Sequence, residues 1–288
     1  MYLIVDSGST KSDWYAIDDA GHVLFSTQTL GLNPHVLSSS ILNERIINNF
    51  TLFKNRNSVK KIFFYGAGCG IFSSQERIKK VFKKIFVNSD FDIKEDTYAA
   101  VYSTAELAEE SIVCIMGTGS NCTYFDGTKI HQKVVSLGYI LMDEASGNFY
   151  GKQLIRSYYF NLLPKKIANK FKKQYDLSPD TIKDKIYRNE NPNSYLAKFA
   201  KFLIEHKKDP FLREMIFKGM RRFINHQILQ FENAKKIPVH FVGSISYFLK
   251  EELEEVFKEY NLKLGKVIKR PIDGLVAFHK SNLDKTFP

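Results

Sequence analysis

The sequence has few cysteines and no long apolar run, and each shortage excludes a class of protein. Its 288 residues include only 3 cysteines with no CxxC pair, so neither a disulfide framework nor a thiolate cage for zinc or an iron–sulfur cluster is expected. No apolar stretch approaches the roughly 20 residues that span a bilayer, and the first residues lack the basic segment and cleavage site of a signal peptide. We therefore expect a cytoplasmic protein with no membrane partner.

Several catalytic motifs are missing as well. The chain contains no GxxxxGK[ST] Walker motif, and its 7 histidines show no HxH or HExxH spacing that would predict a metal cage. No histidine lies close in sequence to Cys69 or Cys122, so nucleophilic catalysis by a cysteine is disfavoured.

The chain is basic, and the excess charge belongs to one segment. Lysine and arginine total 42 against 31 acidic residues, a net charge of +11. Residues 161–236 hold 18 basic and 8 acidic side chains, so the rest of the chain carries only +1. Only 9 of the 42 basic residues are arginine, the better donor to phosphates and bases, so a solvated lysine face is expected and no nucleic-acid partner.

Strand and helix patterns alternate in an order that occurs twice, which indicates the α/β class. The first hundred residues predict three strands, then helix, strand, helix, strand and helix, at 2–9, 13–18, 22–28, 36–53, 61–70, 75–86, 91–94 and from 97. The second half repeats three strands and then becomes helical, with a final strand, helix, strand and short helix, at 111–120, 121–127, 129–136, 146–236, 239–246, 251–260, 263–270 and from 273.

The strand-ending turn DSGSTKSDW, residues 6–14, is the first candidate site. Its backbone N–H groups and hydroxyls suit phosphate oxygens, with an ordinary β-turn as the alternative; the residues concerned are Gly8, Ser9, Thr10 and Lys11. Asp6, at the end of the strand, is placed to hold a divalent cation through water.

Three further turns follow the same logic. In MGTGSNC the glycines let a polyphosphate approach the backbone, and the candidate residues are Gly117, Thr118 and Gly119. VGS, residues 242–244, would let a flat adenine or ribose lie against the chain. LMDEASG, residues 141–147, carries two adjacent acids at a helix start, where acids are also ordinary dipole partners.

These turns carry a family resemblance. The segments that carry it are DSGSTKSDW, EDTYAA (95–100), GTGSNC (117–122), GYILMDEASG (138–147), FVGS (241–244) and PIDGLVAFHK (271–280). In this order, over nearly the whole chain, they resemble the N-acetylglucosamine kinase family and its relatives the BadF/BadG/BcrA/BcrD ATPases, within the actin-like ATPase and sugar kinase superfamily. GTGSNC is the most specific of them.

The resemblance implies two ribonuclease H-like domains around a central cleft. The first would cover residues 1–105, with the C-terminal helix 273–288 as a candidate to complete it, and the second residues 106–272, with a helical segment over 146–236. It also implies phosphorylation of an amino sugar with ATP and Mg²⁺ as cofactors. A homodimer is expected only because members of the family form dimers.

Residue roles follow from the resemblance where the motifs match. Asp96, in the DxxAA pattern, matches the family's general base, Asp6 the magnesium-side acid, and the two glycine turns the phosphate clamps. Gly243 and Ser244 match the adenosine contact. The sugar-binding positions are Asn33, Asn121, Asp143 and Glu144. Glu95, beside the base, is interpreted as a solvated acid.

The sequence departs from the family around the acidic pair. Met142 and Ala145 stand where the family usually has glycines, and Ser136 and Leu137 replace a glycine–tryptophan approach. The extra side chains narrow a pocket that the family keeps open. The substrate therefore stays open to a smaller or non-acetylated amino sugar or a muramic acid derivative, and a non-catalytic sugar or nucleotide sensor is an alternative. The family's relatives add a second alternative, an activator ATPase of the acyl-CoA dehydratase type, which is disfavoured because the cysteines supply no convincing cluster pair.

Overall fold

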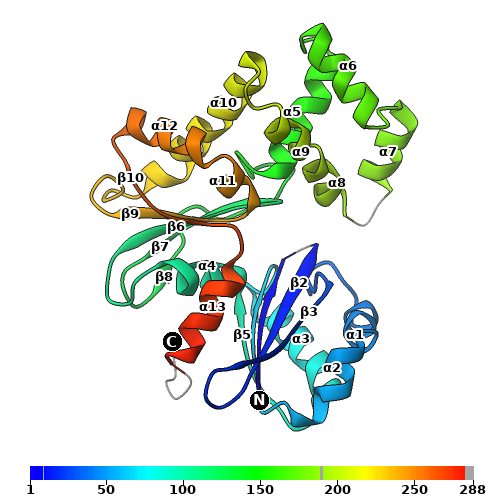
Figure 1. Ribbon diagram of the computed structural model, residues 1–288, viewed down its shortest axis with the longest axis vertical. Helices are drawn as coiled ribbons and strands as arrows, with labels where there is room; N and C mark the ends of the chain where they lie inside the picture. The colour runs from blue at the N-terminus through cyan, green and yellow to red at the C-terminus, as the bar shows by residue number, and fades with distance from the viewer. Residues whose placement is uncertain (9, 189–190, 283–288) are drawn as a thin grey trace. The chain divides into compact units, whose positions relative to one another are not determined.

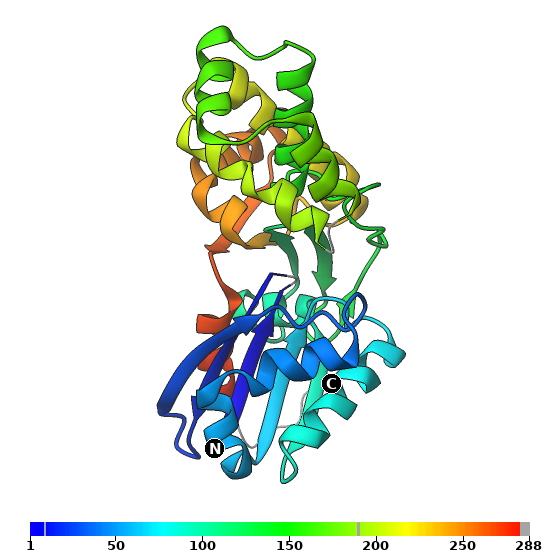
Figure 2. The same ribbon diagram turned by 90° about the vertical axis from the view of Figure 1, so that its right-hand side faces the viewer.

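The computed structural model describes residues 1–8, 10–188 and 191–282, which divide into two compact units. Unit 1 comprises residues 1–106 together with the chain from Arg270 onward, and unit 2 comprises residues 107–269. Each unit has one five-stranded sheet with helices packed against it (Figure 1, Figure 2). The predicted α/β class is confirmed.

The sheet of unit 1 has the strand order β3-β2-β1-β4-β5. Its strands are β1 (Tyr2–Ser7), β2 (Lys11–Ile17), β3 (Val23–Leu30), β4 (Lys61–Gly66) and β5 (Asp90–Glu95). Its helices are α1 (Ser39–Ile47), α2 (Phe50–Asn55), η1 (Arg56–Ser58), α3 (Phe72–Ile85), α4 (Asp96–Thr104) and α13 (Pro271–Lys280). Because β1, β4 and β5 run parallel, their carboxyl ends meet at one edge of the sheet.

Apolar packing on both faces of the sheet holds unit 1 together. Trp14 is fully buried on one face, with its ring 6.1 Å from that of Phe82 in α3. On the other face α13 packs against α4, where the rings of Tyr102 and Phe278 stack 4.4 Å apart. Asp96 is the first residue of α4, one of these two helices.

The single helix predicted over 36–53 is wrong, because the chain forms α1 and α2 with a break between them. Asn49 lies at the break in an extended conformation, and its side chain accepts a hydrogen bond from the N–H of Leu52. Asparagine at such a position caps a new helix better than it continues an old one.

The sheet of unit 2 has the order β10-β9-β6-β7-β8, which repeats the connectivity of unit 1. Its strands are β6 (Ser111–Met116), β7 (Ser120–Phe125), β8 (Ile130–His131), β9 (Pro238–Val242) and β10 (Lys263–Ile268). Its helices are α5 (Gly147–Tyr159), α6 (Lys165–Gln174), α7 (Pro179–Tyr187), α8 (Pro192–Lys198), α9 (Ala200–Glu205), α10 (Pro210–His226), η2 (Ile228–Gln230), α11 (Ser244–Phe248) and α12 (Lys250–Tyr260).

The strand predicted over 129–136 is mostly wrong, since β8 ends at His131. Val135 is 65 % exposed, so the alternating pattern has no buried face to support a strand. No helix in the described part of the chain is long and apolar enough to cross a bilayer.

Candidate functional site

Two acidic side chains lie at the carboxyl edge of the unit 1 sheet. Asp6 is the last residue but one of β1, and Asp96 begins α4 directly after β5. The pKa of Asp6 is raised to about 8, mainly by burial and to a lesser extent by the negative charges of Asp96 and Asp13. Burial, followed by the charge of Glu95, raises the pKa of Asp96 to about 7. The structure thus brings together the carboxylates predicted as cation ligand and base.

The turn after Asp6 is a tight hairpin. The N–H of Gly8 donates to the carbonyl oxygen of Lys11 at 3.0 Å. The ammonium group of Lys11 lies 2.8 Å from Asp13 Oδ2, and Gln28 donates to the other oxygen of that carboxylate at 2.5 Å. Asp13 therefore neutralises Lys11 in this structure. Thr10 is exposed, and the predicted Ser9 lies outside the described residues.

A glycine turn after β4 packs against two polar side chains. Asn33 Oδ1 accepts the N–H of His35 at 2.9 Å, and a Cβ on Gly68, whose φ is +79°, would overlap this oxygen. A Cβ on Gly70 would lie 2.9 Å from a carboxylate oxygen of Glu95. Glu95 is half-buried and its pKa is raised by burial, so the expectation of a solvated acid is wrong.

In unit 2 the start of α5 holds the turn between β6 and β7. The N–H groups of Gly147 and Asn148 donate to the carbonyl oxygens of Gly117 and Thr118, at 2.8 and 3.0 Å. The hydrogen bonds within the described chain leave the N–H groups of Thr118 and Gly119 without an acceptor. Adjacent free N–H groups in a turn suit an anion.

Asn148 connects this turn to the first acid of the pair. Its Nδ2 donates at 2.8 Å both to the carbonyl oxygen of Thr118 and to Asp143 Oδ2. Asp143 is buried with a φ of 70°, and burial raises its pKa against the opposing hydrogen bond from Asn148. Asn148 Oδ1 is buried and has no partner among the described residues. The sequence analysis missed Asn148, since only its position after a helix-opening glycine marks it.

Glu144 and Asn121 are engaged elsewhere. Glu144 Oε1 lies 3.0 Å from a guanidinium nitrogen of Arg222 in α10, a partner that the sequence analysis also missed. Asn121 Oδ1 accepts a hydrogen bond from Gln132 at 3.0 Å. Of the two predicted acids, Asp143 lies beside the turn predicted to bind phosphate, whereas the carboxylate of Glu144 pairs with Arg222 of α10.

The third glycine turn touches the second. Gly243 has a φ of +133°, and a Cβ there would overlap the carbonyl of Met116 and lie 3.0 Å from the N atom of Gly117. Ser244 is exposed and begins α11. Because β6 and β9 are parallel neighbours, the predicted phosphate and adenosine segments meet at the carboxyl edge of this sheet.

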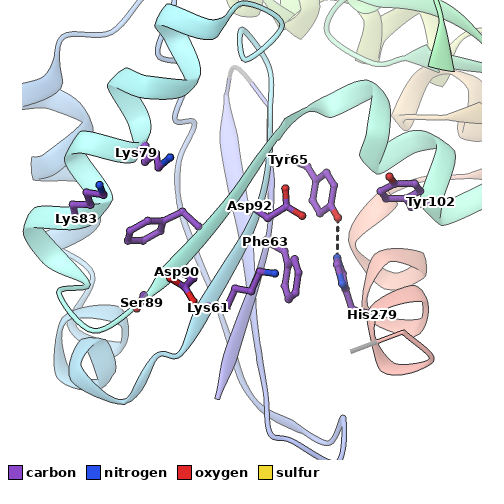
Figure 3. Close-up of a pocket in the computed structure, with 11 residues that line it drawn as sticks. Lys61, Phe63, Tyr65, Lys79, Lys83, Ser89, Asp90, Asp92, Tyr102 and His279 are labelled. Carbon is purple, nitrogen blue, oxygen red and sulfur yellow. Dashed lines mark hydrogen bonds between the residues drawn. The ribbon is translucent and has the colours of Figure 1, made fainter. Parts of the chain in front are cut away.

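A pocket of about 570 Å³ in unit 1 lies away from these residues. Its lining includes Lys61 and Asp90, at the amino ends of β4 and β5, and the hydroxyl of Tyr65, 2.9 Å from His279 Nε2 (Figure 3). None of the predicted site residues lines it. We therefore assign the pocket no catalytic role. Its charges of both signs lie beside the unpaired edge of β5, where charged side chains oppose pairing with a strand of another molecule.

The cysteines and the acids hold no cluster. All three cysteines are buried, and burial raises the pKa of Cys69 to about 12, which argues against a nucleophile or an exposed iron–sulfur ligand. Within residues 1–8, 10–188 and 191–282, no group of three or more His, Cys, Asp or Glu side chains could hold a metal ion.

Comparison with solved structures finds proteins described as sugar kinases. A Porphyromonas gingivalis protein provisionally assigned as an N-acetylglucosamine kinase is 32% identical, with a TM-score of 0.91 over 98% of this chain and 100% of that one. A Chromobacterium violaceum protein with the same provisional assignment is 13% identical, with a TM-score of 0.67 over 96% and 98%. A ROK family glucokinase from Streptomyces griseus, solved with glucose and AMPPNP, is 13% identical, with a TM-score of 0.58 over 96% and 97%.

The two more distant similarities show the fold alone. No protein-family model and no curated protein matches the sequence. The predicted actin-like kinase fold, with two duplicated mixed sheets, is confirmed. The resemblance to the activator ATPases and the roles of individual residues stay predictions.

Proposed function

Because the chain belongs to the N-acetylglucosamine kinase family, within the actin-like ATPase and sugar kinase superfamily, we propose that it transfers the γ-phosphoryl group of ATP to an amino sugar such as N-acetylglucosamine. One observation carries the proposal beyond the fold. Asp96 stands beside Asp6 at the carboxyl edge of the unit 1 sheet, and its pKa is raised to about 7. A carboxylate tuned to neutral pH suits a general base.

Asp96 acts as the base on the sugar hydroxyl. As the hydroxyl oxygen forms its bond to the γ-phosphorus, its proton passes to the Asp96 carboxylate, and the bond from phosphorus to the β,γ-bridging oxygen breaks to release ADP. The raised pKa makes the carboxylate a better proton acceptor than an exposed aspartate.

Mg²⁺ fits the residues of unit 1. Magnesium prefers oxygen ligands and is usually bound by one or two carboxylates together with substrate phosphates, so the absence of a larger cage among the described residues agrees with it. Asp6 is the proposed cation-side acid; burial and neighbouring carboxylates raise its pKa, and a bound cation would stabilise its ionised form. When bound, the ion neutralises charge on the β- and γ-phosphates.

The glycine turns and polar side chains bind the substrates. The free N–H groups of Thr118 and Gly119 suit phosphate oxygens, as do the backbone and hydroxyls of the turn at Gly8, and Gly243 and Ser244 are the proposed adenosine contact. Sugar hydroxyls need amide and carboxylate partners, proposed to be Asn33, Asn121, Asp143 and Glu144.

Asp96→Asn tests the base. We expect turnover, measured as ADP release with Mg-ATP and N-acetylglucosamine, to fall by roughly 10²- to 10⁴-fold, while affinity for AMPPNP changes little. Asp92→Asn is the matched control, because Asp92 lies on β5 at the remote pocket and should leave turnover unchanged. Wild-type turnover in Asp96→Asn would refute the assignment.

A sugar panel tests the substrate. ADP release should be compared across glucosamine, N-acetylglucosamine, N-acetylmannosamine, N-acetylmuramic acid and glucose, since Met142 and Ala145 narrow the region around the acids. A flat response to every sugar, with AMPPNP still bound, would replace the kinase with the non-catalytic sensor.

A further inference from the structure

Helix α6 gathers several lysines of unit 2 on one short element. This helix carries five lysines and no acid, namely Lys165, Lys166, Lys170, Lys172 and Lys173. On α10 and its neighbours several basic side chains face carboxylates, as Arg213 faces Glu255 and Lys207 faces Glu252. No ion pair within the described chain involves a lysine of α6. The basic character of the 161–236 segment is therefore uncompensated here.

The five lysines form one face of the helix. Ile167 and Phe171 are buried and fix the inward side of α6. With 3.6 residues per turn, the lysines fall within an arc of about 160° on the opposite side. All five are exposed, so this lysine face presents its ammonium groups to solvent together.

Exposed apolar side chains adjoin the lysine face. Phe160 and Leu162, in the turn that leads from α5 into α6, are 61 % and 59 % exposed, and Tyr159 is 42 % exposed. Figure 1 and Figure 2 show α6 and α7 at the end of unit 2 that lies away from its own sheet. Lysines and partly exposed apolar residues that are close in sequence thus stand at one end of the unit.

We propose that the lysine face, together with Phe160 and Leu162, docks on an anionic lipid bilayer. Each lysine near an anionic membrane surface raises the membrane partition coefficient of the protein roughly fivefold. Apolar side chains at the same place enter the boundary between the lipid headgroups and the acyl chains. A nucleic acid fits less well, because α6 has no arginine for bidentate contacts and the aliphatic side chain of Leu162 cannot stack on a base. Peripheral docking needs no spanning helix, although it departs from the expectation of no membrane partner.

Vesicle co-sedimentation of the full chain tests the proposal. The probes are vesicles of phosphatidylcholine alone and of equal parts phosphatidylcholine and phosphatidylglycerol. We expect binding to the anionic vesicles, reduced at least about tenfold by the combined change K165Q, K166Q, K172Q and K173Q. The matched control is K54Q, K80Q, K133Q and K235Q, which removes the same charge from exposed lysines on separate segments and should retain binding.

A second variant separates the apolar contribution. Phe160→Ser with Leu162→Ser keeps every lysine, and we expect weaker binding that high salt then abolishes. Equal binding to both kinds of vesicle, equal loss in the control, or double-stranded DNA that binds more tightly than the anionic vesicles and displaces them would each overturn the proposal. Turnover with N-acetylglucosamine should be unchanged in all variants, so the outcome does not depend on the proposed kinase activity.

Discussion

A single side chain, Asn148, touches two of the segments proposed to bind substrate. Its amide group donates to the Thr118 carbonyl and to Asp143, which fixes the carboxylate relative to the phosphate turn. A buried amide with both donors used and a free oxygen also has room for one more hydrogen bond. If these segments bind the phosphates and the sugar as proposed, Asn148 is a positioning residue for both.

Asn148→Ala should weaken both substrate binding and stability. The free energy of unfolding, from urea denaturation, should fall by about 1–3 kcal/mol, since Asp143 and the Thr118 carbonyl lose buried partners. KM for both ATP and the sugar should rise more than kcat falls. Asn225→Ala is the control, because the side chain of Asn225 makes an exposed hydrogen bond to Tyr260 and no other among the described residues. An unchanged KM for both substrates would contradict the positioning role.

The raised pKa of Asp6 predicts that the stability of the folded protein depends on pH. The folded protein holds this proton up to about pH 8, against a reference pKa of 3.8, so the folded state binds protons more tightly than the unfolded state. The contribution of Asp6 to stability is therefore present at low pH and is lost as pH rises between these values.

Asp6→Asn should consequently raise the melting temperature at pH 9 more than at pH 6, with no Mg²⁺ present. The same variant should lose Mg-ATP-dependent turnover. Thermal unfolding at the two pH values measures the effect, and an equal shift at both would show that Asp6 ionises normally in the folded protein.

At the residue scale, local motifs in the sequence pointed to glycines and acids, whose roles stay predictions, and gave no sign of their distant partners. The Gly117 turn and Asp96 are recognisable because their neighbours in sequence form the motif. Arg222 lies 78 residues from Glu144, so only the fold brings them together.

Among the elements, the turn that ends β6 is tightly packed on one side and open on the other. A Cβ on Gly243 would overlap the Met116 carbonyl, whereas a Cβ on Gly117 would meet no atom within 4 Å. Packing therefore requires a glycine at residue 243. At residue 117 there is space for a side chain, and the proposed phosphate would lie there.

The two glycines should respond differently to alanine. Gly243→Ala should lower the free energy of unfolding by more than about 2 kcal/mol, because overlap adds to a strained φ. Gly117→Ala should change it by less than about 0.5 kcal/mol and still reduce AMPPNP affinity at least about tenfold. Urea denaturation and calorimetric titration measure the two effects. Full AMPPNP affinity in Gly117→Ala would remove this turn from the proposed nucleotide site.

The order of elements was predictable, and their interruptions were not. Strand and helix periodicity indicated the duplicated pattern that both sheets show. The break at Asn49 depends on a helix cap, and β8 ends early because no element in the described part of the chain packs over the residues that follow it. The periodicity of apolar residues reports neither. Local hydrogen bonding and tertiary packing decided both.

For the whole molecule, the path of the chain matters most. Unit 1 contains α13, although all of unit 2 lies between this helix and α4 in the sequence. Ile272, Leu275, Val276 and His279 of α13 are buried. A Cβ on Gly274 would lie 2.7 Å from Ser103 of α4, so the two helices are in close contact.

A chain ending at Lys269 should keep unit 2 and lose unit 1. Hydrogen exchange measured by mass spectrometry should show protected amides in β6 and β9 and faster exchange in β1, β4 and α4, because α4 loses its packing partner. Leu275→Ala in the full chain should have a milder effect and lower the free energy of unfolding by about 2–5 kcal/mol. Full protection of β1 and β4 in the shortened chain would contradict this dependence.

The position of α13 also sets the order in which the protein can be completed during translation. All of unit 2 emerges from the ribosome before α13 does, so the sheet that carries Asp6, and the helix α4 that begins at Asp96, stay partly uncovered while unit 2 is being made. A message truncated late would therefore yield a chain with a complete second unit and an unfinished first one. Such a product could retain the turns of unit 2 while lacking a stable setting for the proposed base.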